Sequence, residues 1–130
     1  MAKVLMIDDD KDMCEEMTEI MGDAGIELTA VSDPVKGLKL TRGKEFDLFL
    51  LDLKMPKVTG YEILRDIKKR DAGMKVIVIT GAPLQQIAGL EAKGDERYLK
   101  EILGLADEVI SKPVDIDYVI KKIKELTRKS

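Results

Sequence analysis

Residues 4–10 read Val4-Leu5-Met6-Ile7-Asp8-Asp9-Asp10, four apolar side chains followed by three acids. An apolar run of this length without alternation is typical of a strand that is buried on both faces of a parallel sheet. Three later runs end in the same way, at Asp52 after residues 48–51, at Thr80 after residues 76–79, and at Lys112 after residues 109–111. Because ligands of open α/β sheets bind at the carboxyl ends of the strands, we expect these polar side chains to converge on one site.

Helical segments separate the apolar runs. Asp10 and Asp33 are candidate N-caps, and Gly25 and Gly43 are candidate stops, for the first two helices. The expected strands are residues 4–7, 27–31, 48–51, 76–79 and 108–111, and the expected helices are about residues 11–24, 34–42, 61–70 and 116–126, with two helical pieces between 82 and 105.

This alternation of strands and helices predicts an α/β fold with right-handed crossovers. We expect a flavodoxin-like, doubly wound, five-stranded parallel sheet in the order 2-1-3-4-5, with helices on both faces. That order makes strands 1 and 3 neighbours at the point where the chain reverses direction across the sheet. Asp8, Asp9 and Asp52 would then be neighbours as well. We expect residues 1–130 to form a single domain.

Composition narrows the class of protein. The 22 basic and 25 acidic residues give a net charge of −3, which does not favour a nucleic-acid surface. No apolar run approaches the roughly 20 residues that span a bilayer, so we expect a cytoplasmic protein without membrane insertion. The absence of histidine excludes a histidine base, metal ligand or phosphohistidine within the chain. Cys14 shares a helical face with methionines and is predicted to be a buried thiol.

The converging side chains predict a phosphoryl-binding site. Three carboxylates at one sheet edge repel one another, and a divalent cation would remove that repulsion. A cluster of oxygen ligands without His or Cys suits Mg²⁺. Asp8 and Asp9 are adjacent and suited to hold the cation, whereas Asp52 stands alone and is the better nucleophile for an acyl phosphate. Lys112 and Thr80 could contact the oxygens of the bound anion.

Simpler interpretations exist for each motif taken alone. The acids at residues 8–10 could form a solvated turn and helix cap, and capping is the role we expect for Asp10. Thr80 could bond to its own backbone at the end of a strand, and Lys112 could be a surface ammonium. All these residues occur at the ends of predicted strands in one chain, and this combination favours the phosphoryl site.

Four segments together resemble the receiver domain of response regulators in two-component signalling: residues 4–10, residues 50–56 with Gly60, residues 79–82, and residues 111–113. The resemblance extends along the whole chain. It implies that Asp52 is the phosphoacceptor and that Asp8, Asp9 and Asp52 hold Mg²⁺ with the backbone carbonyl of Lys54. It also implies that Thr80 is the switch hydroxyl and that Lys112 contacts the phosphoryl group. Because no linker, repeat or low-complexity tail follows the last helix, we expect no output domain.

The chain departs from this family pattern in two ways. Thr80 and Lys112 are 32 positions apart, which is farther than is usual in the family and lengthens the region of the fourth helix. The position three residues before the lysine usually carries an aromatic that moves with the threonine, and here it is Val109. Tyr98 could replace that aromatic. We therefore expect the phosphoryl chemistry to follow the family more closely than the route by which the signal leaves the site.

The function that follows is that of a phosphorelay receiver. A sensor histidine kinase or histidine phosphotransfer protein would phosphorylate Asp52 in the presence of Mg²⁺, and output would pass through binding to a downstream protein. We expect no enzymatic turnover beyond self-catalysed phosphoryl transfer and slow autodephosphorylation. One alternative is a phosphohydrolase, which usually carries an acid two residues after the nucleophile, where this chain has Lys54. The other is a receiver-like scaffold that is never phosphorylated.

Overall fold

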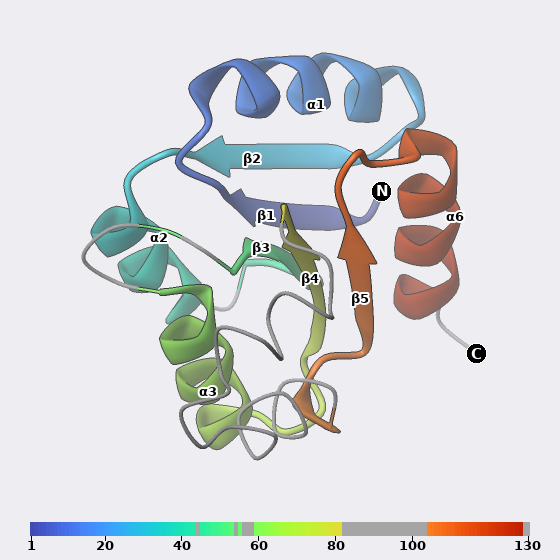
Figure 1. Cartoon of the computed structure of the whole chain (residues 1–130). Coiled ribbons are helices and arrows are strands. Elements are labelled where there is room, and N and C mark those ends of the chain that lie inside the picture. Colours follow the sequence, from blue (N-terminus) through green and yellow to red (C-terminus); the bar gives the residue numbers. More distant parts are fainter. Residues whose placement is uncertain (44, 54, 56–58, 82–103, 129–130) are drawn as a thin grey trace.

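The computed structural model describes residues 1–43, 45–53, 55, 59–81 and 104–128. Five parallel strands form one sheet in the order β2-β1-β3-β4-β5 (Figure 1). The strands are β1 (Lys3–Ile7), β2 (Glu27–Val31), β3 (Leu48–Asp52), β4 (Lys75–Thr80) and β5 (Glu108–Ser111), and the helices are α1 (Lys11–Asp23), α2 (Pro34–Thr41), α3 (Gly60–Arg70) and α6 (Ile116–Thr127). The predicted fold class and strand order are confirmed.

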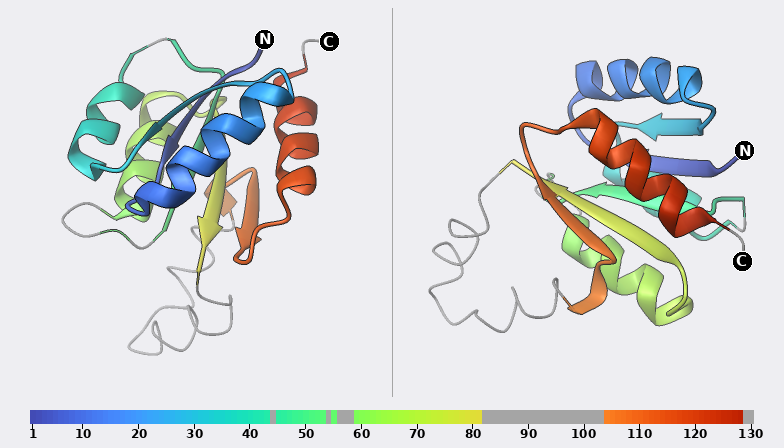
Figure 2. Two further views of the ribbon diagram at one scale, coloured as in Figure 1. Left: turned by 90° about the horizontal axis from the view of Figure 1, so that it is seen from above. Right: turned by 90° about the vertical axis from the view of Figure 1, so that its right-hand side faces the viewer.

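Helices cover both faces of the sheet (Figure 2). Alternate residues of each strand point to opposite faces, so β1 sends Val4 and Met6 to one side and Leu5 and Ile7 to the other. The first side packs against α1 and α6, and the second against α2 and α3. Strands β1 and β3 are almost fully buried, which explains why their sequences are apolar without alternation.

Each described helix begins at a side-chain cap. The side chains of Asp10, Asp33, Thr59 and Asp115 accept hydrogen bonds from backbone N–H groups in the first turns of α1, α2, α3 and α6. Thr59 places the start of α3 at Gly60, one residue before the predicted start. Within the described part of the chain, no helix is long and apolar enough to cross a membrane. The two helical pieces expected between residues 82 and 105 lie almost entirely outside the described residues.

Two glycines let α2 and α3 approach the sheet closely. A Cβ atom at Gly60 would lie 2.0 Å from the backbone oxygen of Asp52, and a Cβ at Gly37 would lie 2.7 Å from the side chain of Ile7. The backbone N–H of Gly60 also donates to the carbonyl of Leu53 at 3.1 Å. The first turn of α3 is therefore in direct contact with the backbone at the end of β3.

The amino edge of the sheet, where the strands begin, is held by a partly buried ion pair. Lys68 Nζ lies 2.9 Å from Asp107 Oδ2 and donates to the carbonyl of Met74 at 2.6 Å. The same Asp107 oxygen accepts the backbone N–H of Val76 at 2.8 Å. This network joins the end of α3 to the first residues of β4 and to the approach to β5. Charge and hydrogen bonding together fix this edge.

Candidate functional site

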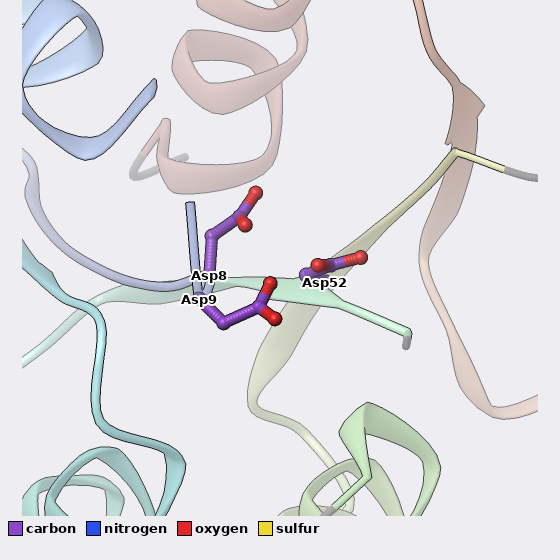
Figure 3. A group of neighbouring side chains, drawn as sticks. All are labelled: Asp8, Asp9 and Asp52. Atoms are coloured by element: carbon purple, nitrogen blue, oxygen red, sulfur yellow. The ribbon is translucent and has the colours of Figure 1, made fainter. Parts of the chain in front are cut away.

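The three predicted acids, Asp8, Asp9 and Asp52, lie together at the carboxyl edge of the sheet (Figure 3). Asp8 and Asp9 follow the last residue of β1, and Asp52 is the last residue of β3. Residues Ile7 and Leu51 are partners in the β1–β3 register, so the two chain segments leave the sheet side by side. The adjacency of strands 1 and 3 is what brings acids from distant parts of the sequence together.

The three acids are close enough to share one ion. One carboxylate oxygen from each of Asp8, Asp9 and Asp52 lies within 4.8 Å of the others. Asp8 is 1% exposed and Asp52 is 6% exposed, whereas Asp9 is open to solvent. Burial removes much of the water that would screen their mutual repulsion, so this cluster favours a bound cation.

Lys112 lies against these acids. Its Nζ atom is 3.3 Å from Asp8 Oδ2 and 4.0 Å from Asp52 Oδ2. Its stem passes Gly81, where an added Cβ would lie 3.7 Å from Lys112 Cδ. Lys112 thus carries a positive charge to the two buried carboxylates.

Thr80 lies at the end of β4, next to the strand that ends at Asp52. Its side chain is buried, and its carbonyl accepts the backbone N–H of Lys112 at 2.7 Å. Asp52 and Ile79 are partners in the β3–β4 register, and Thr80 is paired with Ser111 of β5. The hydroxyl, the ammonium and the acids therefore belong to one continuous edge made by β1, β3, β4 and β5.

Local hydrogen bonds hold Asp8 in place. The backbone N–H of Asp10 donates to Asp8 Oδ1 at 3.0 Å. The Cys14 thiol donates to the backbone carbonyl of Asp8, with Sγ and O 3.2 Å apart. Burial, aided by the negative charge of Asp8, raises the pKa of the Cys14 thiol to about 11. Cys14 is thus a buried hydrogen-bond donor and a neutral thiol at physiological pH, as its place on the helix predicts.

The donor set fits a hard divalent cation. All three candidate ligands are carboxylates, and among the described residues no Cys or His side chain belongs to this group. Ions such as Mg²⁺ prefer oxygen ligands and commonly bind through one to three carboxylates with water completing the shell. The three acids of this edge could therefore hold Mg²⁺. The predicted fourth ligand, the carbonyl of Lys54, lies outside the described residues.

Sequence reasoning brought Asp8, Asp9, Asp52, Thr80 and Lys112 to one edge, and the structure places all five there. It did not foresee that Lys112 bonds to Asp8, that Cys14 donates to the Asp8 carbonyl, or that α3 touches the Asp52 backbone. The glycine at position 60 was the one available signal for that last contact. Tyr98, the candidate moving aromatic, lies outside the described residues, and Val109 packs against the core on the α3 side.

Comparison with known proteins gives a consistent result. The family model of the response regulator receiver domain matches residues 4–124. A response regulator receiver protein of Anaeromyxobacter sp. strain Fw109-5 is 34% identical over 80 residues, which are 62% of this chain and 34% of that protein. The transcriptional regulatory protein CusR of Escherichia coli K12 is 28% identical over 100 residues, which are 75% of this chain and 44% of CusR. The chain spans about half or less of the length of these curated relatives.

Solved structures resemble the chain over nearly its full length. A CheY-like receiver domain protein from Methanospirillum hungatei JF-1 superposes with a TM-score of 0.81 at 28% identity, covering 98% of this chain and 94% of that one. The response regulator TrrA of Thermotoga maritima, solved in complex with Mg²⁺ and BeF, gives a TM-score of 0.75 at 25% identity. That match covers 97% of this chain and 99% of TrrA.

Proposed function

Because the chain belongs to the response regulator receiver domain family of two-component signalling, we propose that it is a phosphorelay receiver whose phosphoacceptor is Asp52. The observation that carries the proposal is the carboxyl edge itself. Two buried acids, one exposed acid, a buried hydroxyl and an ammonium lie together there. This combination suits transfer of a phosphoryl group, which depends on positioning and charge neutralisation more than on a base.

Each residue has a distinct task in the proposed reaction. An Asp52 oxygen attacks the phosphorus of a phosphohistidine on the donor protein, forming an O–P bond while the P–N bond breaks. The imidazole leaves with the bonding electron pair and takes up a proton. Lys112, which is 4.0 Å from Asp52, pairs with an oxygen of the new phosphoryl group, and Thr80 donates its hydroxyl to another.

We assign the cation site to Asp8, Asp9, Asp52 and the backbone carbonyl of Lys54. Bound Mg²⁺ would offset the negative charge of the incoming phosphoryl group. The Mg²⁺ complex of TrrA supports this assignment by likeness. Lys112 donates to Asp8 in the structure, and its ammonium has further N–H donors that could contact an oxygen of the phosphoryl group.

The partners follow from this chemistry. The donor would be a sensor histidine kinase or a histidine phosphotransfer protein, because this chain has no histidine of its own. Phosphorylation would shift an equilibrium between two conformations, and the output would be binding to a downstream protein. Slow loss of the phosphoryl group by hydrolysis would reset the domain.

The test uses acetyl phosphate as the donor. The protein is incubated with Mg²⁺ and acetyl phosphate, and intact mass and free phosphate are followed over time. We expect one phosphoryl adduct per chain with slow release of phosphate. The Asp52→Asn variant should form no adduct, and Asp23→Asn, which removes an exposed acid at the far end of α1, should behave as the unchanged protein.

The same measurement separates the alternatives. Rapid release of many phosphates per chain would indicate a phosphohydrolase. A folded protein that binds Mg²⁺ but forms no adduct, with acetyl phosphate or with a phosphorylated histidine donor, would indicate a scaffold. An adduct that persists in Asp52→Asn would place the phosphoacceptor elsewhere.

A further inference from the structure

A basic surface lies on the α2–α3 side of the sheet, away from the acids of the candidate site. Helix α2 and its C-cap expose three basic side chains and no acidic one. Helix α3 exposes three more, together with the acid Glu62 in its first turn. We call this surface the basic face, and it comprises Lys36, Lys39, Arg42, Arg65, Lys69 and Arg70.

Helix α1 of the opposite layer has the reverse charge. Helix α1 exposes five acids, Asp12, Glu15, Glu16, Glu19 and Asp23, against the single base Lys11. The chain as a whole has a net charge of −3, so the basic face is a local exception to the overall charge. A surface of this kind attracts an acidic partner and steers its approach.

Hydrogen bonds and ion pairs join the C-terminal ends of α2 and α3 within this face. Arg70 donates to the hydroxyl of Thr41 at 3.0 Å and to the Thr41 carbonyl at 3.3 Å. The Asp66 carboxylate lies 2.9 Å from Arg70 and 3.8 Å from Arg42. One carboxylate thus holds two guanidinium groups in fixed positions, and positive charge remains.

A cavity of about 470 Å³ lies between these ends. Its apolar lining comes from Phe46, Phe49, Ile67 and Met74, and its polar lining from Thr41, Arg42, Arg70 and Asp71. The rings of Phe46 and Phe49 are tilted against each other with centroids 6.0 Å apart. A volume of this size is in the range of sites that bury an apolar group beside a few polar contacts.

We propose that the basic face and this cavity form a docking site for an acidic polypeptide segment that inserts one aromatic or large aliphatic side chain. Exposed ion pairs alone contribute little to affinity, so the buried anchor supplies most of the free energy and the charges supply selection and orientation. Asp66 and Asp71 are interspersed among the bases and oppose a continuous phosphate backbone, which favours a peptide over a nucleic acid. This site is separate from the carboxyl edge and does not depend on phosphorylation.

The test uses the full chain and a defined probe, a fluorescein-labelled peptide with the sequence Glu-Glu-Asp-Phe-Glu-Glu. Binding is measured by fluorescence anisotropy at low and at high salt, and the contact surface is mapped by amide chemical shifts. We expect saturable binding that weakens with salt and shifts at Gly43, Phe46 and Asp71. The double variant Lys39→Glu, Arg42→Glu should bind about tenfold more weakly.

Two controls make the result specific. The double variant Lys121→Glu, Lys124→Glu makes the same charge change on exposed positions of α6 and should bind as the unchanged protein does. A peptide with Ser in place of Phe should lose most of the binding, because the cavity then receives no anchor. Both double variants are checked for unchanged unfolding midpoints.

Each contrary result overturns the proposal. Absence of saturable binding would show that the face does not dock acidic segments. Equal weakening by the α6 variant would show that only net charge matters. Tighter binding of a single-stranded oligothymidylate to the same residues would assign the face to nucleic acid instead.

Discussion

The two edges of the sheet use the same kinds of side chains in opposite ways. At the amino edge, Asp107 pairs closely with Lys68 and more distantly with Lys75, and backbone groups complete the hydrogen bonding of Lys68 and Asp107. At the carboxyl edge, Asp8, Asp9 and Asp52 face Lys112, the cation that the described residues supply to them. At the amino edge the acid is matched by cations, whereas among the described residues of the carboxyl edge three acids face one ammonium.

This difference separates an edge whose charges are satisfied within the fold from one whose acids a bound cation would stabilise. A satisfied, partly buried pair resists change, because breaking it leaves a charge without a partner. A crowded set of acids is costly in the unbound protein and improves when a cation or a phosphoryl group with its cation arrives. The fold places these two kinds of site at opposite ends of the same strands.

The largest effect that we predict concerns Gly60, where the carboxyl edge meets α3. Replacement of Gly60 by Ala would put a Cβ 2.0 Å from the Asp52 carbonyl oxygen, so α3 or β3 must shift. We expect the free energy of unfolding to fall by about 3 kcal/mol or more, measured by urea denaturation.

The matched control for that change is Gly22→Ala in α1. An added Cβ at Gly22 meets no atom within 4 Å, and the position is exposed. Alanine is the better helix former, so this variant should gain about 0.5 to 1 kcal/mol. Equal effects at the two positions would contradict the assigned contact between α3 and the end of β3.

The second effect is at the amino edge. Lys68→Met removes the cation and leaves Asp107 partly buried without it, so we expect a loss of about 2 kcal/mol in the free energy of unfolding. Lys75→Met is the control, because Lys75 lies 3.9 Å from Asp107 and is more exposed. It should cost less than about 0.5 kcal/mol. If the two variants lost the same stability, the Lys68–Asp107 pair would not be what holds this edge.

The third effect concerns the excess charge at the carboxyl edge. Mg²⁺ at ten times its dissociation constant should raise the free energy of unfolding by about 1.4 kcal/mol and raise the melting temperature, because it binds the folded state. Asp9→Asn should remove most of this gain, and Asp23→Asn should keep it. A full Mg²⁺ effect in Asp9→Asn would mean that the cation binds without that carboxylate.

The smallest effect concerns Cys14 behind Asp8. Its pKa is raised from 9.0 to about 11 on folding. Because folding raises this pKa, the protonated Cys14 thiol contributes fully to the free energy of unfolding below pH 9. This contribution is lost as the pH rises toward 11. The unfolding free energy should therefore fall with pH over this window, and less steeply in Cys14→Val. At neutral pH the folded thiol should react with a disulfide reagent far more slowly than in the unfolded chain.

Much of the fold could be predicted because the buried strands carry their own signal. The apolar runs of β1 and β3 marked central strands, and side-chain caps such as Asp10 marked the helix starts. The convergence of the three acids at the carboxyl edge followed from the predicted strand order. The amino-edge pair could not be predicted, since Lys68 and Asp107 lie 39 residues apart in segments that read as ordinary charged surface. Such a pair depends on how two distant segments are placed in the folded structure, and the sequence next to either residue gives no sign of it.

The contact between Lys112 and Asp8 spans 104 positions and joins the first strand of the sheet to the last. The carboxyl edge therefore takes its residues from the early, middle and late parts of the sequence. A fragment that ends before β5 can form β1 and β3 and still lack the ammonium, and one that begins after β1 lacks two acids. Cation binding at this edge therefore needs only the segments that carry the three acids, whereas contact between an ammonium and a bound phosphoryl group also needs the chain beyond the final strand.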